Sequence, residues 1–457
     1  MTDTEKLINS NDDIQTPSTV KVYKKRWLIL LIFSINSMAN TTLFTCITAI
    51  NKIVCKYYHI SPELTNWAGN IFSLVYVLIA LPSAYCMDNF GIKTLLIIGS
   101  SLNGVCVCLH LAGTTQQGIS FVMTGQIFSA FSVGAVAQIP SRLSMVWFSE
   151  QEYAKAIGLS GIFNLIGQAI GFLQPSYMVP DSDDMDEIYD GLLRMNISHV
   201  ALLAVCLISA YLFFDEKPPL PPSYAKAVLD SSSITIDERV ATPCFKQSLR
   251  MLLHDKNFMI FCLAFGIQAG LFNFFIICLN QMASHIANSK DIGWIGFTGN
   301  TATIIGVIVF ASIVDKYKCY KKMMFFLFFM QILSWIAFSS VILYWKVKLL
   351  LFLTYAALCI FSIPFMAIGM SYSAELTYPI SEGLSSGVSL MFGNGFGFLV
   401  IITMGRLIDA NYLFLTCAIV TGFYTTGFLL CFFIKENLKR SNIELQKERV
   451  PLTPENT

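Results

Sequence analysis

Long apolar runs alternate with short polar segments along this chain. A helix that crosses a bilayer needs about 20 mainly apolar residues, and twelve runs meet that requirement. Glycine and proline inside the runs do not exclude them, because neighbouring helices satisfy the backbone groups that these residues leave free. The pattern predicts an all-α membrane protein with twelve transmembrane helices, at 27–50, 66–87, 94–113, 118–141, 153–175, 196–214, 257–280, 292–314, 322–344, 347–370, 383–406 and 411–434.

The longest polar segment between these runs has six runs on each side of it. It opens with Asp215-Glu-Lys-Pro-Pro-Leu-Pro-Pro-Ser223, which favours an extended, semi-rigid strap; a ligand for an SH3-type domain is the alternative. The pattern therefore predicts, in order, a tail, a six-helix half, a linker, a second six-helix half and a tail, at 1–26, 27–214, 215–256, 257–434 and 435–457.

The composition agrees with a lipid environment. Hydrophobic residues make up 55% of the chain and charged residues 13%, whereas about a quarter of a soluble protein is charged. The net charge of +1 gives no reason to expect a nucleic-acid partner. The 13 cysteines are scattered, mostly inside the apolar runs, so neither a disulfide framework nor a metal site is expected.

Lysine and arginine set the expected orientation. With the N-terminus inside, 23 of the 30 lie in cytoplasmic segments and seven outside, which is the bias typical of membrane proteins. Both termini are expected in the cytoplasm, and the acidic loop 181–187 on the opposite side. The plasma membrane is the default location, because no sorting signal stands out.

Two stretches, one in each half, resemble each other. Phe148-Ser-Glu-Gln-Glu152 leads through Asn164 to Gly167, and Tyr378-Pro-Ile-Ser-Glu382 leads through Asn394 to Gly397. Transporters built from two repeats bind substrate where the repeats meet. The echo thus predicts a six-plus-six transporter and makes the two asparagines equivalent candidates to line its cavity; amides that only join neighbouring helices are the alternative.

An acidic turn follows the second run of each half: Asp88-Asn-Phe-Gly91-Ile-Lys93 and Asp315-Lys-Tyr-Lys318. Glycine permits a tight reversal, and an aspartate can accept hydrogen bonds from the NH groups that begin a helix. The turns resemble the loop Gly-x-x-x-Asp-Arg/Lys-x-Gly-Arg/Lys of the major facilitator superfamily, with departures at Ala84, Asn89 and Lys318.

These turns are the expected cytoplasmic gate. We expect Asp88 and Arg142 in one half, and Asp315 and Glu375 in the other, to set the balance between inward and outward states. A purely structural turn is the alternative.

Uncharged polar and aromatic side chains take the place of charges inside the runs. No run carries a carboxylate at its centre, so movement down a gradient is expected rather than a proton relay. Aromatic faces attract quaternary ammonium groups by about 0.5–2 kcal/mol each. The candidates inside the runs are the amides Asn164, Asn273 and Asn394 and the rings Phe44 and Phe274; helix–helix contact is the alternative for each amide and packing for each phenylalanine.

The chain resembles the feline leukaemia virus subgroup C receptor-related transporters of the major facilitator superfamily. The resemblance runs nearly end to end, on Arg26-Trp27, Ser37-Met38, Pro140-Ser-Arg142, Val146-Trp147-Phe148, Gly171-Phe172-Leu173, Glu216-Lys217-Pro218, Pro221-Pro222-Ser223, Glu375-Leu-Thr-Tyr-Pro379-Ile-Ser-Glu382-Gly383 and Ser385-Ser386-Gly387.

The resemblance implies uptake of choline or ethanolamine, or export of haem, through a site like an aromatic cage with glutamines. The family's helix 1 tryptophan falls at Phe44 and its helix 7 tyrosine at Asn273. Its helix 5 glutamine falls at Leu165, beside Asn164, and its helix 11 glutamine at Asn394. A weaker trimethylammonium cage is implied, and another small, partly polar or vitamin-like substrate is the alternative.

The sequence is therefore interpreted as an alternating-access uniporter for a choline- or ethanolamine-like solute. A haem or porphyrin exporter and a non-transporting receptor on the same fold are the alternatives. Its expected partners are the substrate and the lipid bilayer, with a monomer as the oligomeric state. No cofactor is expected, and no nucleophile–base pair suggests an enzyme.

Overall fold

The computed structural model describes residues 22–136, 139–149, 152–220, 222, 245–317, 319–377, 380 and 382–435. Most of both predicted tails, most of the polyproline strap and Lys318 lie outside these residues. So do parts of the two echoed stretches, at 150–151, 378–379 and 381. The side chains of Asp88, Asp315 and Glu382 are also outside the description.

The described chain is helical in every predicted run. The helices are α2 (Lys25–Ala49), α3 (Asn51–Tyr58), α4 (Pro62–Ala112), α5 (Ile119–Val136), α6 (Ile139–Trp147), α7 (Tyr153–Met178), α8 (Met185–Phe213), α10 (Phe245–His254), α11 (Lys256–Ala283), α12 (Ser289–Tyr317), α13 (Tyr320–Ser340), the π-helical turn η3 (Val341–Trp345), α14 (Lys348–Thr377), α15 (Glu382–Asp409) and α16 (Leu413–Phe433).

Among the described residues, eleven helical segments are long and apolar enough to cross a membrane. The remaining predicted run, 66–87, forms the first part of α4, which continues into the next run. The predicted start of the sixth run at 196 is wrong, because α8 begins at Met185. The Asp184 carboxylate accepts from the Asp186 NH at 2.9 Å, and this cap extends the helix into polar sequence.

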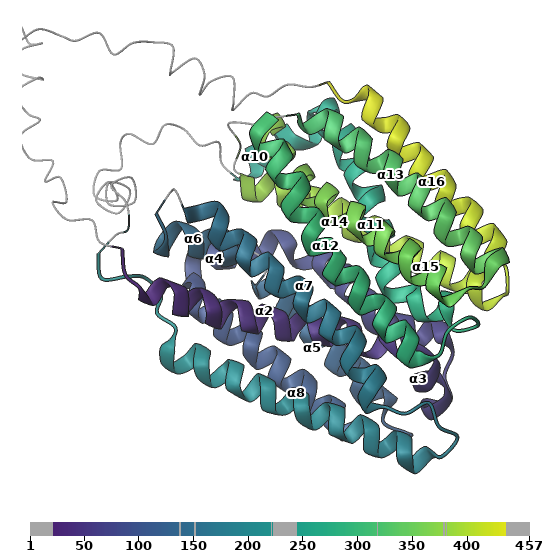
Figure 1. The fold of residues 1–457 in the computed structure, drawn as a ribbon. Helices are drawn as coiled ribbons and strands as arrows, with labels where there is room; N and C mark the ends of the chain where they lie inside the picture. The colour runs from purple at the N-terminus through teal and green to yellow at the C-terminus, as the bar shows by residue number, and fades with distance from the viewer. Residues whose placement is uncertain are drawn as a thin grey trace, which may run out of the picture.

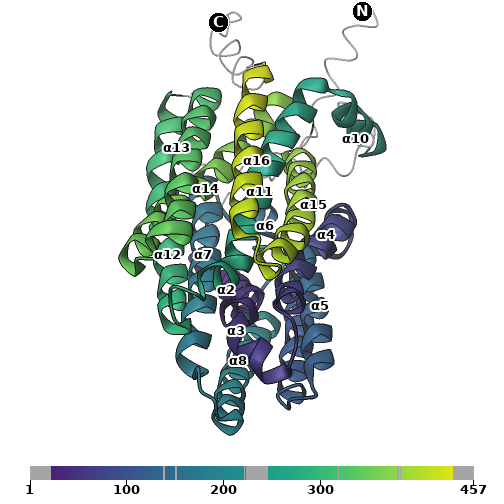
Figure 2. The same cartoon turned by 90° about the vertical axis from the view of Figure 1, so that its right-hand side faces the viewer.

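The helices form two bundles. Figure 1 shows α2 to α8 grouped in one half of the molecule and α11 to α16 in the other. The halves pack on each other mainly through α7 against α12 and α4 against α15. Figure 2 shows α3 and the first turns of α8 at one end, and α10 with the last turns of α16 at the other. We call these the α3 end and the α10 end.

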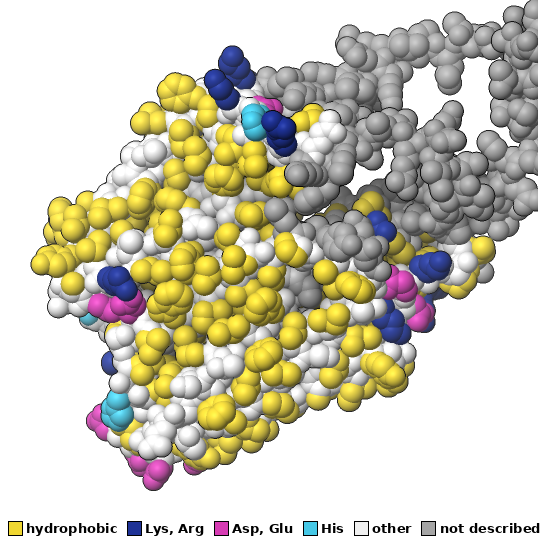
Figure 3. Space-filling model, turned by 180° about the vertical axis from the view of Figure 1, so that it is seen from behind, with side chains coloured by type: hydrophobic (Ala, Val, Ile, Leu, Met, Phe, Trp, Pro, Cys, Tyr) yellow, Lys and Arg dark blue, Asp and Glu magenta, His cyan; other side chains and the backbone are white. Residues whose placement is uncertain are grey.

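The outer surface suits lipid. Figure 3 shows hydrophobic side chains spread over one face, with charged side chains gathered toward its ends. Large apolar side chains such as Leu78, Ile305 and Leu353 are more than half exposed. Exposure of this kind is a liability in water and the normal condition in a bilayer.

Gly91 joins the second and third runs within α4. Its backbone has φ 79° and ψ 175°, a conformation that is essentially restricted to glycine. The next two NH groups, of Ile92 and Lys93, each donate to the Glu216 carboxylate at 2.7 Å. The predicted tight reversal is therefore present, but the carboxylate seen at this helix start comes from the linker, which the sequence patterns did not indicate.

Candidate functional site

The two halves are tied together at the α3 end. The ties are hydrogen bonds and ion pairs between side chains of one half and groups of the other: Asn280 to Ala49 and Lys52, Asn66 to Gln281, Asn70 to Phe398, Trp294 to Tyr177 and Arg406 to Glu63. Most of the amides involved are buried. Buried polar groups are costly to leave unpaired, so these ties stabilise closure at this end.

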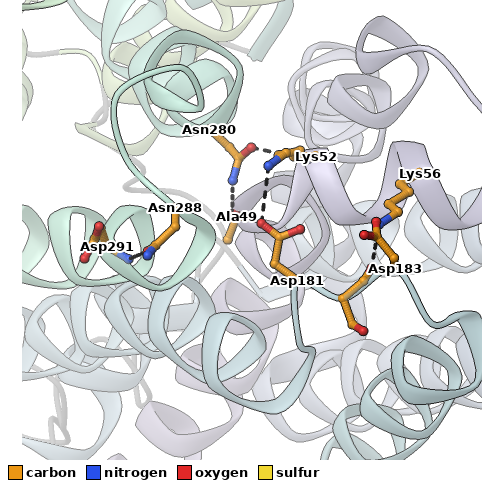
Figure 4. A network of polar contacts seen from close by, with 9 residues as sticks. Ala49, Lys52, Lys56, Asp181, Asp183, Asn280, Asn288 and Asp291 are labelled. Atoms are coloured by element: carbon orange, nitrogen blue, oxygen red, sulfur yellow. Dashed lines mark hydrogen bonds and ion pairs between the residues drawn. The ribbon is translucent and has the colours of Figure 1, made fainter. Parts of the chain in front are cut away.

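Asn280 is buried and bonds to two groups of the first half (Figure 4). Helix α2 ends at Ala49 and α3 begins at Asn51, so the break leaves helix-end backbone groups without partners inside their own helix. Asn280 Nδ2 donates to the Ala49 carbonyl at 2.6 Å, and the Lys52 NH donates to Asn280 Oδ1 at 3.2 Å. One carboxamide from the second half therefore completes a broken helix of the first.

Helix α3 itself belongs to the first half. Lys52 Nζ pairs with Asp181 at 3.3 Å, and Lys56 pairs with Asp183 in the acidic loop (Figure 4). The hydrogen bond from Lys56 lowers the pKa of the Asp183 carboxyl. Tyr57 also donates to the Thr114 carbonyl at 2.8 Å. These contacts make α3 move with the first half when the halves rock.

At the α10 end the described contacts stay within each half. Arg26 pairs with Glu152 at 2.9 Å, and Lys25 pairs with Asp215, all in the first half or the start of the linker. Lys321 donates to the Ile434 carbonyl at 2.6 Å in the second half. No hydrogen bond or ion pair between two described residues joins the halves here, and the two bundles diverge toward this end (Figure 1).

Two candidate amides meet in the second half. Asn273 Nδ2 donates to Asn394 Oδ1 at 3.4 Å, and Asn394 Nδ2 donates to the Leu390 carbonyl at 2.9 Å. Helices α11 and α15 bring them together, because a Cβ on Gly270 would lie 2.6 Å from the Gly397 nitrogen. Both asparagines are half-buried.

The third candidate amide lies in the first half. Asn164 Nδ2 donates to Ser37 Oγ at 3.2 Å, and the Asn164 carbonyl accepts from Thr41 Oγ1 at 3.0 Å. A Cβ on Gly167 would lie 2.2 Å from the Met38 carbonyl oxygen. The echo predicted from sequence therefore has a structural counterpart: each asparagine stands three residues before a glycine where two helices touch.

Phe44 lies at the boundary between the halves, where α2, α4 and α7 face α11, α12 and α15. We call this boundary the seam. The Phe44 ring makes an edge contact with Phe72 of the same half at 5.1 Å and also packs against the core of the second half. Helices rise 1.5 Å per residue, so counting back from the Ala49–Asn280 contact puts Phe44 about 7.5 Å and Asn273 about 10.5 Å deeper. The aromatic ring and the amide pair therefore lie at similar depth.

Phe274 is fully enclosed. Its side chain has no exposed surface and contacts Phe275, which stacks on Trp335 and Tyr424 inside the second half. Its expected role as a wall of the substrate site stays a prediction.

The expected gate residues differ in burial and in their contacts. Arg142 is exposed, makes no ion pair with a described residue, and lines a cavity of about 610 Å³ with Lys93, Gly91 and Glu216. Glu375 is buried and engaged in an interaction. The pairing of Asp88 and Asp315 lies outside the described side chains, so the predicted gate stays a prediction.

No group of three or more His, Cys, Asp or Glu residues in the described part of the chain is arranged to hold a metal ion. The candidate residues Phe44, Asn164, Asn273 and Asn394 are neutral amides and an aromatic ring, which bind through hydrogen bonds and ring electrostatics.

Comparison with known proteins places these features in a family. The family model described as Major Facilitator Superfamily matches residues 28–379. The chain is 30% identical over 428 residues to the choline/ethanolamine transporter FLVCR2 of Rattus norvegicus, covering 93% of this chain and 77% of the relative. It is 28% identical to the choline/ethanolamine transporter FLVCR1 of Felis catus, covering 92% and 74%.

Solved structures share the fold. A D-xylose–proton symporter aligns with a TM-score of 0.70 at 12% identity, over 90% of this chain and 98% of its own. The partially occluded inward-open xylose transporter XylE from E. coli aligns with a TM-score of 0.70 at 10% identity, over 95% and 100%. The sequence expectations of fold and family are confirmed.

Proposed function

The chain belongs to the Major Facilitator Superfamily and, within it, to the family of FLVCR1 and FLVCR2, and we propose that it carries small amino alcohols of the choline and ethanolamine type across a membrane. Substrate would bind at the seam between Phe44, Asn164, Asn273 and Asn394. The observation that carries this proposal is the seam itself. Amides of both halves lie on helices that meet there, and Phe44 lies at a depth similar to that of the Asn273–Asn394 pair, where the halves touch at one end and diverge at the other.

The molecule is in one state of an alternating-access cycle under this proposal. The lysine and arginine bias assigns the α10 end to the cytoplasm, so the structure corresponds to an inward-facing state. Opening the α3 end requires rupture of the inter-half ties, including both bonds of Asn280. Exposed Arg142 is then available to meet a carboxylate of the second half as the α10 end closes.

We further propose that transport is facilitative and takes place at the plasma membrane. The amides and the ring at the seam carry no charge, so the site offers no group that must bind or release a proton in each cycle. Uptake should therefore follow the substrate gradient alone and persist when sodium or the proton gradient is removed.

The test is uptake of labelled choline, ethanolamine and haem in cells that express the chain at the surface. We expect uptake of an amino alcohol, and Asn164→Ala or Asn394→Ala should lower it about five- to thirtyfold, because about 1–2 kcal/mol of hydrogen bonding is lost. Asn300→Ala is the matched control, since this buried amide bonds only within α12, to the Gly296 carbonyl.

Three outcomes would count against the proposal. Uptake of haem alone would favour the exporter alternative, and no flux despite surface expression would favour a non-transporting receptor. If amino alcohol uptake is present and both seam variants retain it fully, transport stands and the proposed site is wrong.

A further inference from the structure

The candidate amides have side-chain groups that make no hydrogen bond with a described residue. Whether these groups donate or accept bears on the kind of substrate that can bind. Asn394 uses its NH₂ on the Leu390 carbonyl, which turns its oxygen toward α11. Asn273 must then present its own NH₂ to that oxygen. The Asn273 oxygen is consequently turned away from the pair, and no described residue donates to it.

The first half offers a similar group. Asn164 donates its NH₂ to Ser37 Oγ, and no described residue donates to the Asn164 side-chain oxygen. Both asparagines are half-buried rather than enclosed. Each half therefore contributes a half-buried asparagine whose carboxamide oxygen takes no hydrogen bond from a described residue and can only accept one.

The half-buried aromatic rings near these amides are phenylalanines. Phe44 makes an edge contact with Phe72 that occupies part of its ring, and Phe392 and Phe396 flank Asn394 on α15. A single phenylalanine ring attracts any ammonium group, whether or not the nitrogen carries methyl groups. The ring therefore favours a cation without choosing among ammonium types.

From these observations, and resting on the proposed function, we infer that the seam selects an ammonium group that still carries N–H bonds over a trimethylammonium group. An NH₃⁺ group can donate to the Asn164 and Asn273 oxygens as the halves close around it. Trimethylammonium would leave both acceptors facing methyl groups, and a site built to hydrogen-bond its substrate discriminates strongly against an analogue that lacks the donor. Asn273 and Asn164 are the specificity-determining residues, and Asn394 positions Asn273.

A graded series of competitors tests this on the unaltered protein. Ethanolamine, N-methylethanolamine, N,N-dimethylethanolamine and choline carry the same charge but progressively fewer N–H donors. Against uptake of labelled ethanolamine, we expect potency to fall at each methylation, with choline at least tenfold weaker than ethanolamine. Equal or greater potency of choline would overturn the inference while leaving the proposed function intact.

Variants supply a second, independent readout. Asn273→Leu should lower kcat/KM for ethanolamine at least tenfold and for choline less than threefold, and Asn394→Leu should act in the same direction by freeing Asn273. The matched control Asn300→Leu should change neither. Equal losses for both substrates at normal surface expression would overturn the inference. Absence of uptake of every member of the series would instead overturn the proposed function, and this inference with it.

Discussion

A carboxamide can donate and accept at the same time, and Asn280 uses both abilities across the boundary between the halves. Its bonds to the Ala49 carbonyl and the Lys52 NH complete the break between α2 and α3. Both bonds exist only while the α3 end is closed. Asn280 therefore favours the arrangement that is closed at the α3 end, which is how one residue can bias a two-state equilibrium.

Asn280→Ala should shift the molecule toward the outward-facing state. Loss of two buried hydrogen bonds costs about 2 kcal/mol, or about thirtyfold in the ratio of the states. Spin labels or fluorophores on the two halves at the α3 end would report the larger separation. Asn288→Ala is the control, because Asn288 only caps its own helix through the Asp291 NH at 2.8 Å. An unchanged distance distribution for the Asn280 variant would contradict this role.

At the scale of elements, α4 contains two of the predicted helices, joined by a fixed bend at Gly91. Gly91 supplies a backbone conformation restricted to glycine, and Glu216 from the start of the linker accepts the next two NH groups. The start of the linker is thereby fastened to the third run. The bend is set jointly by a local residue and by one far away in sequence.

Gly91→Ala should destabilise the protein by about 1–3 kcal/mol. The added Cβ adopts an unfavourable backbone conformation and would lie 2.5 Å from Glu216 Oε1, so the carboxylate must also move. Thermal unfolding in detergent measures the effect. Gly104→Ala is the control within the same helix, since no atom lies within 4 Å of its added Cβ, and it should be neutral or slightly stabilising. Equal melting temperatures for the two variants would contradict the argument.

At the scale of the whole molecule, the ties at the α3 end and the divergence at the α10 end define one state of a rocking cycle. Asn66 Nδ2 lies 3.7 Å from Cys278 Sγ in the other half and also donates to Gln281 Oε1 at 2.7 Å. A covalent bond at this point would hold the halves in the present arrangement and stop the cycle.

Asn66→Cys should allow such a bond to the native Cys278. Mild oxidation is expected to reduce uptake to near background, and a reductant should restore it, because the α3 end can no longer open. In the double variant Asn66→Cys with Cys278→Ser, the same oxidant should leave uptake unchanged. Full transport by the cross-linked protein would show that the α3 end need not open for substrate to pass.

Several features followed from the sequence alone because they depend on composition or on short-range pattern. Apolar runs of about 20 residues must be helical in lipid, since no water is present to satisfy the backbone, and each of the twelve runs falls on a helix. In both echoed stretches the asparagine stands three residues before a glycine at a helix contact, and the predicted role of Asn164 and Asn394 in lining a cavity stays a prediction. The family was also evident from motifs spread along the chain.

Only the tertiary structure decided which polar groups of different helices meet. Periodicity could not tell that Asn273 meets Asn394 while Phe274 is fully buried, because the direction of a side chain depends on how its helix is rotated against its neighbours. Nor could it pair Glu216 with the turn at Gly91, or Asn280 with the break after Ala49, since these partners are separated by more than a hundred residues. The sequence by itself determined the helices and their grouping into halves, because the solvent dictates both. The packing of the halves decided which amides join the two halves and which bond only within their own helix.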